Sequence, residues 1–383
     1  MKALVYVQHL LGIGHLARVS RIAAALSEDG IDVTLVSGGT PVSGFAKAQV
    51  KLVQLPPIRS RDTSFSELVD AEDRPLSDEF KAMRRDRLLA TLAATQPDVL
   101  IIEAFPFGRR QMRFELIPLL EAAKAQQHPP IIASSVRDIL QENRKPERAE
   151  ETVRTVEEFF DLVLVHGDPG FARLEETFPL ARRIAERIVY TGLVAGEAQT
   201  SRDHFDVVVS AGGGSAGRKL IQAAAEAAPR LMARWPRWCI ITGPNYPQSE
   251  QAAHATRLPQ GVTLETFRPD FPGLLANAGL SVSQAGYNTV CDILRARCPA
   301  VLIPFAEGGE SEQSDRAERL EKLGIARVVR EDRLTAESLA EAMQDAPEPA
   351  AQAIDLDGAR QTARLIRDRF AAVSESRQGR LKH

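Results

Sequence analysis

The chain has 383 residues, of which 44% are hydrophobic and 26% are charged, and its net charge is -3. A chain longer than about 300 residues usually divides into two domains, and it buries enough apolar surface to fold without disulfides or a structural metal. The near-neutral charge excludes the basic footprint that a nucleic-acid-binding protein needs.

The cysteines indicate a reducing compartment, and the short apolar runs indicate a soluble chain. Cys239, Cys291 and Cys298 are odd in number and lack the paired spacing of a zinc site, so neither a disulfide framework nor a metal is expected. Residues 3–7 are too short for a signal-peptide core, and no apolar run approaches the roughly 18 residues that span a bilayer. We expect a soluble, cytoplasmic protein, which could still rest on the inner face of a membrane.

Short runs rich in Val, Ile and Leu alternate with helical patterns along the first half, which predicts a parallel sheet of strand–helix–strand units. A helix is predicted over residues 16–28, because its apolar residues recur at helical spacing and Gly30 can end it. Polar residues 58–77 are predicted to form either a solvated connection or a mobile lid. The predicted strands are residues 3–7, 33–37, 99–102, 131–133 and 162–165.

A second alternation follows a polar linker at residues 193–202 and predicts another parallel sheet. The fold class is therefore α/β, with two doubly wound domains over residues 1–198 and 199–354. The predicted strands of the second half are residues 205–210, 238–242, 262–265, 280–282 and 300–303, and its helices are residues 219–234, 288–297 and 312–323, with a terminal helix at 356–373.

The loop after the first predicted strand is the first candidate site. Gly12 and Gly14 allow a tight turn and the close approach of a ligand. His15 would open the following helix, where an imidazole tends to be neutral and can act as a general base. A histidine that merely caps the helix fits the pattern equally well, and His9 is predicted to be structural.

The loop of residues 210–217 (SAGGGSAG) is the second candidate. Gly212, Gly213 and Gly214 would expose consecutive N–H groups, and Ser215 would add a hydroxyl donor. Such a nest suits a phosphate, although a plain flexible turn is the alternative.

The third candidate is the stretch of residues 283–292 (SQAGYNTVCD). Gly286 would turn the chain, and Asn288 or Thr289 would start a helix whose N–H groups can hold a diphosphate. Asp292, about one turn into that helix, could accept two ribose hydroxyls. A favourable interaction with the helix dipole would also explain this acid.

The fourth candidate is the Gly-rich loop of residues 304–313. Glu312 and Gln313 offer the acceptors and donors that bind sugar hydroxyls. The alternative is that both are exposed polar residues at a helix start.

Three further strand ends and one motif give weaker predictions. Glu103 and Arg137 could line the acceptor side of a site, and His166 ends another predicted strand. A structural loop residue or an ion pair is the simpler interpretation of each. The Asp-x-Asp motif that starts at Asp355 precedes the terminal helix and is interpreted as a helix cap.

Basic residues of the first half could contact anionic lipid, although a solvated helix face is the simpler interpretation. They are Lys81, Arg84, Arg85, Arg109, Arg110 and Arg113.

The four candidate loops, in this order, resemble the GT-B glycosyltransferases, and most of all the MurG-like enzymes of glycosyltransferase family 28. The resemblance is strongest over residues 266–324 and covers about half of the chain well. It implies two Rossmann-like parallel-sheet domains that face a cleft, with a terminal helix, residues 355–383, that returns to the first domain.

The resemblance also implies an activity, which is inverting transfer of a hexose such as N-acetylglucosamine from a UDP-sugar to a hydroxyl acceptor of lipid-linked or cell-envelope type. His15 would be the base or would position the acceptor. No cofactor or metal is expected, because N–H donors at two helix ends can stabilise the leaving diphosphate. The implied donor-binding residues are Gly14, Gly213, Gly214, Ser215, Phe267, Arg268, Ser283, Gly286, Tyr287, Asn288, Thr289, Asp292, Glu312 and Gln313.

Other activities fit the same residues. The stretch from Gly12 through His15 to Arg18 also resembles UDP-sugar hydrolases of the nonulosonate pathway, in which such a histidine activates water. A sugar-nucleotide 2-epimerase is a third possibility, and a non-catalytic subunit that binds a nucleotide sugar is a fourth. The segment Thr191-Gly192-Leu193-Val194-Ala195 departs from the family pattern, which has a basic residue in this stretch.

Overall fold

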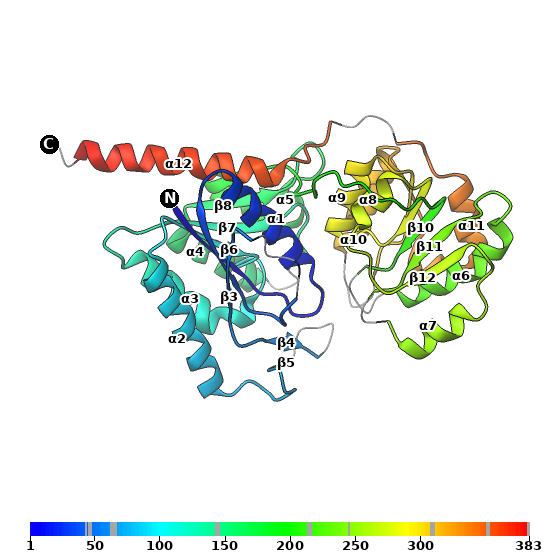
Figure 1. The fold of residues 1–383 in the computed structure, drawn as a ribbon. Coiled ribbons are helices and arrows are strands. Elements are labelled where there is room, and N and C mark those ends of the chain that lie inside the picture. Colours follow the sequence, from blue (N-terminus) through cyan, green and yellow to red (C-terminus); the bar gives the residue numbers. More distant parts are fainter. Residues whose placement is uncertain are drawn as a thin grey trace. The chain divides into compact units, whose positions relative to one another are not determined.

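The computed structural model describes residues 1–42, 44, 48–61, 67–141, 146–212, 217–243, 246–306, 311–349 and 353–380, the side chains of 376–380 excepted. The chain divides into two compact units. The first comprises Met1–Val194 and Ile354–His383, and the second comprises Ala195–Ala353. Each unit has a parallel sheet with helices packed against it (Figure 1), so the predicted α/β class is confirmed.

The first unit contains a parallel sheet in the order β3-β2-β1-β6-β7-β8-β9. The predicted strands all occur, and the edge strands β3 and β9 add to them. These two are short and partly exposed, so they lack the continuous apolar run that marks a buried strand. The strands are β1 (Lys2–Val7), β2 (Asp32–Ser37), β3 (Lys51–Gln54), β6 (Val99–Glu103), β7 (Ile131–Arg137), β8 (Leu162–His166) and β9 (Ile188–Tyr190).

The helices of the first unit include the terminal helix, which packs against α1. They are α1 (Gly14–Glu28), α2 (Asp78–Thr95), α3 (Arg113–Lys124), α4 (Pro146–Phe159), α5 (Leu174–Thr177) and α12 (Gly358–Arg380), with short 3-10 helices at Arg110–Met112 and Pro179–Arg187. The segment predicted as a loop contains a small antiparallel hairpin, β4 (Arg59–Ser60) and β5 (Leu68–Val69), and ends at Ser77, whose side chain caps α2.

The second unit contains a parallel sheet in the order β12-β11-β10-β13-β14-β15. Its strands are β10 (Val207–Ser210), β11 (Trp238–Ile241), β12 (Val262–Glu265), β13 (Leu280–Ser283), β14 (Ala300–Leu302) and β15 (Ala326–Val328). Its helices are α6 (Arg218–Leu231), α7 (Gln248–Ala255), α8 (Phe271–Ala276), α9 (Tyr287–Ala296), α10 (Glu312–Lys322) and α11 (Ala336–Gln344), with a 3-10 turn at Glu331–Arg333.

The strand order of each sheet reverses direction at one point, and this positions the candidate sites. The reversal lies between β1 and β6 in the first unit and between β10 and β13 in the second. Ligands of doubly wound sheets bind beside such a switch point, at the carboxyl ends of the strands. Within the residues that the structure describes, no helix is long and apolar enough to cross a membrane.

One sequence prediction is wrong. Arg84 is predicted on a solvated or lipid-contacting basic face, and it does not lie on one. Its side chain is fully buried, where its Nε donates to Oε2 of Glu115 at 2.6 Å and its Nη2 donates to Oε1 of Gln8 at 2.6 Å. Helix α2 packs against α3, and Arg84 projects inward at that contact. A buried arginine needs such partners, since an unpaired buried charge costs several kcal/mol.

Candidate functional site

His15 and Glu103 meet at the switch point of the first sheet. Helix α1 starts at Gly14, directly after β1, and Glu103 is the last residue of the neighbouring β6. Nδ1 of His15 lies 3.0 Å from Oε1 of Glu103. The His15 side chain is 19% exposed, whereas Glu103 is fully buried. No side-chain cap bond is present at the start of α1, so His15 pairs with Glu103 instead of capping the helix.

The electrostatics of this pair keep the carboxyl ionised and the imidazole neutral. Burial raises the pKa of Glu103, but the charge of Arg18 and the hydrogen bonds from His15 and Ser135 outweigh it and lower that pKa to about 2. Burial lowers the pKa of His15 to about 3, with the charge of Arg109 adding to the effect. An ionised carboxylate only accepts, so Nδ1 of His15 must donate to Glu103. The lone pair of Nε2 therefore remains available to take a proton.

A second layer of polar side chains supports Glu103. Oγ of Ser135 donates to Oε2 of Glu103 at 2.5 Å, and Nε2 of His166 lies 2.9 Å from the same Oγ. Nδ1 of His166 lies 2.8 Å from Oγ1 of Thr191. Ser135 lies near the end of β7, His166 ends β8 and Thr191 follows β9, so the layer crosses neighbouring strands. In the sequence, Ser135 and His166 could be found only by their positions after predicted strands, and Thr191 had no such signal.

Positive charge gathers beside His15. Arg109 takes a left-handed conformation in the loop after β6, with φ of 56°, and its Nε donates to the carbonyl of Gln8 at 2.7 Å. Burial lowers the pKa of Arg109 to about 10, and the charge of Arg137 contributes to the shift. Arg137 is the last residue of β7 and is partly exposed. The predicted acceptor-side residues Glu103 and Arg137 thus lie at neighbouring strand ends, although Glu103 points at His15.

In the second unit, two described glycines lie between β10 and α6. Gly212 has φ of 72°, and Gly217 precedes the first residue of α6. A Cβ at Gly217 would collide with the Cβ of Ala211, so the helix can begin this close to β10 only with glycine at that position. The predicted donor residues Gly213, Gly214 and Ser215 lie outside the described residues.

The turn between β13 and α9 leaves open space at the start of the helix. Gly286 is the N-cap of α9, and a Cβ there would meet nothing within 4 Å. The helix starts at Tyr287, slightly earlier than predicted, so Asn288 and Thr289 lie in its first turn. Asp292 lies in the next turn and is 6% exposed.

Ser283 faces the interior of the sheet. It is fully buried at the end of β13, and its Oγ lies 2.9 Å from Oγ of Ser281. This hydrogen bond joins two serines on the same face of one strand, as expected for residues two apart. The structure therefore shows Ser283 hydrogen-bonded within its own strand, and its predicted contact with the donor stays a prediction.

The predicted sugar-binding pair differs in exposure. Glu312 is 2% exposed, and its Oε1 accepts from Nη2 of Arg316 at 2.8 Å. Nη1 of Arg316 donates to the carbonyl of Ala285 at 3.1 Å, which ties α10 to the turn before α9. Sequence reasoning missed Arg316, although its spacing of four residues from Glu312 is a recognised helical ion pair. Gln313 is partly exposed, and its Oε1 accepts from the backbone N–H of Phe305 at 3.2 Å.

Arg268 and Phe267 follow β12 and behave differently. Hydrogen bonds to Asp270 and Asp203 raise the pKa of Arg268, whose guanidinium also bonds Glu265 at 3.0 Å. The Arg268 side chain therefore anchors the segment after β12 to Asp203, which precedes β10. Phe267, by contrast, is 57% exposed and leaves an aromatic face in solvent.

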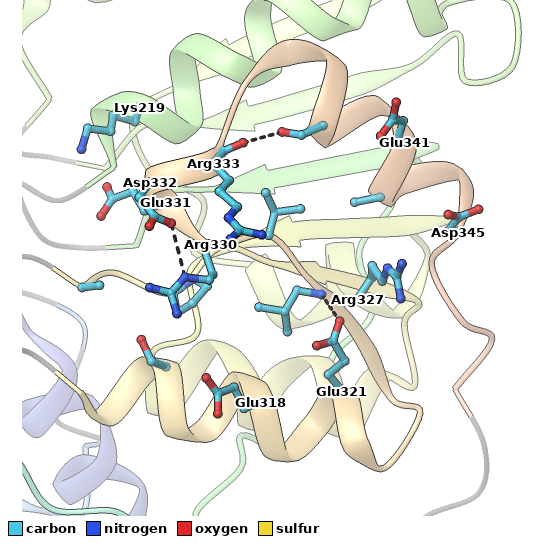
Figure 2. A pocket seen from close by; sticks show the side chains of 17 residues that line it. Lys219, Glu318, Glu321, Arg327, Arg330, Glu331, Asp332, Arg333, Glu341 and Asp345 are labelled. Carbon is cyan, nitrogen blue, oxygen red and sulfur yellow. Dashed lines mark hydrogen bonds and ion pairs between the residues drawn. The ribbon is translucent and has the colours of Figure 1, made fainter.

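The second unit also has a charged cavity of about 650 Å³. Figure 2 shows that acids of α10 and α11 and basic residues of β15 and the turn after it surround this cavity. The backbone N–H of Val328 donates to Oε1 of Glu321 at 2.9 Å, and Arg330 pairs with Asp332 at 3.3 Å. None of the predicted donor residues that the structure describes lines this cavity.

The Asp-x-Asp motif shapes the backbone before α12. Oδ1 of Asp355 accepts from the backbone N–H of Asp357 at 2.9 Å, and the backbone N–H of Asp355 donates to Oδ2 of Asp168 at 2.9 Å. In the described part of the chain, no group of three His, Cys, Asp or Glu side chains is arranged to hold a metal ion.

Comparisons with known proteins support the predicted resemblance. Residues 207–369 match the family described as "Glycosyltransferase family 28 C-terminal domain". The chain is 31% identical over 225 residues to the UDP-N-acetylglucosamine–N-acetylmuramyl-(pentapeptide) pyrophosphoryl-undecaprenol N-acetylglucosamine transferase of Symbiobacterium thermophilum, covering 56% of this chain and 59% of that one. It is 30% identical to the Thermotoga neapolitana protein of the same name, over 45% of this chain and 49% of that one. The chain thus spans about half the length of these relatives.

Solved structures give the same result for the fold. Acinetobacter baumannii MurG superposes with a TM-score of 0.58 at 17% identity, covering 96% of this chain and all of that chain. The calicheamicin glycosyltransferase CalG4 superposes with a TM-score of 0.59 at 18% identity, covering 100% of this chain and 98% of that chain. The chain therefore has the GT-B fold, and its residues 207–369 match the C-terminal domain of glycosyltransferase family 28.

Proposed function

We propose that the protein is a glycosyltransferase that moves a hexose, N-acetylglucosamine or a similar sugar, from a UDP-sugar to a hydroxyl acceptor. The observation that carries this proposal is the pair of His15 and Glu103 at the switch point of the first sheet, 3.0 Å apart. The first unit supplies a neutral base, and the family 28 domain of the second unit supplies the donor-binding groups.

The donor would be held by the strand ends of the second unit. The backbone N–H groups at the starts of α6 and α9 suit a diphosphate, because a helix N-terminus favours negative charge. Asp292 would accept ribose hydroxyls, and the segment around Phe267 would contact the base. Because Glu312 is paired with Arg316, we assign the sugar hydroxyls to Gln313 and a supporting role to Glu312.

The transfer would proceed in one displacement. The acceptor oxygen attacks the anomeric carbon as the bond from that carbon to the diphosphate breaks, so the configuration inverts. His15 takes the acceptor proton on Nε2, and ionised Glu103 stabilises the imidazolium that forms. Backbone N–H donors stabilise the charge on the leaving diphosphate, and each is worth about 2.7–4 kcal/mol in comparable sites. We assign no step to a metal ion.

The acceptor that fits the first unit carries an anionic group. The charge of Arg109 acts on His15 and that of Arg137 acts on Arg109, and guanidinium groups bind phosphate oxygens well. The relatives named above act on a pyrophosphoryl-undecaprenol acceptor according to their names. We therefore propose a lipid-linked phosphate or diphosphate acceptor and contact with the inner face of a membrane.

The function is tested by incubating the protein with UDP-N-acetylglucosamine and a lipid-linked diphosphate sugar, with and without EDTA. We expect a glycosylated product with inverted anomeric configuration, formed at the same rate when divalent ions are removed. Reactions without acceptor separate the other classes: free sugar released at the same rate would indicate a hydrolase, and a changed sugar would indicate an epimerase. A bound but unchanged donor would indicate a non-catalytic subunit.

Gly286→Ala is expected to weaken UDP binding at least about tenfold, equivalent to 1.4 kcal/mol, without loss of stability. The added methyl meets no protein atom within 4 Å, but it would occupy the space at the start of α9 that the diphosphate needs. Calorimetric titration with UDP and a denaturation curve measure the two quantities.

Gly12→Ala is the matched control for that substitution. Its added Cβ also meets nothing within 4 Å, and it lies in the first unit. UDP affinity should remain at the wild-type value in this variant. If both variants lost the same affinity for UDP, or if Gly286→Ala lost none, the diphosphate would not bind at this turn.

A further inference from the structure

A buried chain of hydrogen bonds runs from Glu103 away from His15, through side chains to which the proposed reaction assigns no step. It passes from Oε2 of Glu103 to Ser135 at 2.5 Å, from Ser135 to His166 at 2.9 Å, and from His166 to Thr191 at 2.8 Å. Glu103, Ser135 and His166 are fully buried, and Thr191 is 1% exposed. The sheet register fixes their order, because Glu103 pairs with Ser135 and β7 pairs with β8.

The chemistry of the groups determines the direction of each hydrogen bond. Glu103 is ionised and accepts only, so the single hydroxyl proton of Ser135 is directed to Oε2. Oγ of Ser135 must then accept from Nε2–H of His166. Burial, together with the charge of Arg18, lowers the pKa of His166 to about 3 against the opposing effect of Glu103, so this ring is neutral. A neutral ring with its proton on Nε2 accepts at Nδ1, and Thr191 is the donor.

All protons of the chain therefore point toward Glu103. Three side chains donate to its two oxygens: His15 and Arg18 to Oε1, and Ser135 to Oε2. The orientation of the carboxylate is fixed from both sides of the group. This orientation in turn directs Nδ1–H of His15 and leaves its Nε2 unprotonated.

A network that only stabilised the fold would not need every hydrogen bond to donate toward Glu103. Burying four polar side chains costs free energy unless each finds a partner, and apolar residues of similar size would fill the same strand ends more simply. The strand neighbours Val136 and Val165 are apolar and equally buried. Ser134, also buried on β7, bonds the backbone carbonyl of Phe105, whereas Ser135, His166 and Thr191 form one chain of side chains that ends at Glu103.

We propose that His166 is a positioning residue, which acts through Ser135 to hold the Glu103 carboxylate in the orientation that keeps His15 ready to accept a proton. This inference rests on the proposed role of His15 as the base of the transfer. His166 would not touch either substrate, so its contribution should appear in kcat and not in the affinity for the donor.

Four variants test the proposal in the full-length protein. His166→Leu removes the donor to Ser135, and His166→Gln retains an N–H that can reach it. Ser135→Ala removes the donor to Glu103. Ser134→Ala is the matched control, because Ser134 is a fully buried neighbour on the same strand whose Oγ donates to the carbonyl of Phe105 at 2.8 Å and does not bond Glu103.

We expect kcat to fall about tenfold in His166→Leu and at least as much in Ser135→Ala, with the UDP dissociation constant unchanged. His166→Gln should recover most of the loss, and Ser134→Ala should match the wild type. Loss of the Ser135 hydrogen bond makes Glu103 more basic, so the acid limb of the kcat/KM profile should move to higher pH. The charged groups that act on His15, namely Arg109, Arg18 and Glu103, are the same in all four variants.

The tautomer of His166 gives a readout that is independent of activity. Nitrogen-15 NMR of the imidazoles should show His166 neutral with its proton on Nε2 from about pH 5 to pH 8. A ring protonated on Nδ1, or a charged ring, would overturn the proposal even if transfer is observed. The proposal would also be overturned if His166→Leu and His166→Gln lost the same fraction of kcat and the acid limb of the kcat/KM profile did not move. Absence of transfer by the wild type would refute the proposed function, while the NMR result would still decide the direction of the chain.

Discussion

Replacing His15 by glutamine is expected to lower kcat by about 10³-fold and to leave UDP binding unchanged, because general-base catalysis contributes roughly 10²–10⁴-fold. Glutamine can still donate an N–H to Glu103, so the buried carboxylate keeps a partner. It has no basic nitrogen that could take the acceptor proton. Steady-state kinetics with saturating donor measure the fall in kcat, and calorimetry with UDP measures the binding.

His9→Gln is the control for His15→Gln. His9 lies in the same loop and is 4% exposed, and its Nε2 bonds the carbonyl of Thr40 at 2.9 Å. That bond is structural, so kcat should change little. If His15→Gln kept wild-type turnover, the assignment of His15 as the base would be wrong.

The activity of the wild type should not decline on the acid side until well below pH 6. The pKa of His15 is lowered from 6.5 to about 3, chiefly by burial, so the ring stays neutral over the usual range. A base with a lowered pKa becomes protonated, and so inactive, only as the pH falls toward that pKa. A kcat/KM profile that halves near pH 6.5 would contradict this assignment of charge.

The sequence predicted the architecture well because parallel strands and their helices leave local signals. The loops that start at Gly12 and Gly286 could be recognised from the residues alone, since glycines after apolar runs mark strand-to-helix turns. The pairing of His15 with Glu103 could not be recognised in the same way. It joins residues 88 positions apart and depends on β1 lying beside β6.

Buried charges were the least predictable feature. Arg84 lies in a basic stretch that suggests a solvated face, and only its distant contact with Glu115 reveals its burial. Glu312 is an acid at the start of a helix, where such a residue is usually exposed, yet it is buried against Arg316. Periodicity reports which residues share a face, but it does not report whether a charged residue finds a partner inside.

Glu103→Gln is expected to lower kcat by about 10³–10⁴-fold, the loss seen when the acid behind a catalytic histidine becomes an amide. An amide can donate to Nδ1 of His15, which then carries its proton on Nε2 and can no longer act as a base. Arg18 also loses the negative charge it pairs with inside the first unit. Removing one partner of a buried ion pair costs about 3–5 kcal/mol, so stability should fall together with activity.

Glu115→Gln separates these two effects. Glu115 is also fully buried, and it pairs with Arg84 at 2.6 Å, but it does not touch His15. Denaturant unfolding should therefore show similar losses of stability in the two variants, while kinetics at a temperature where both are folded should show a large loss of kcat in Glu103→Gln alone. If the two variants lost turnover equally, the effect of Glu103 would follow from destabilisation, and its role in setting the tautomer of His15 would have to be abandoned.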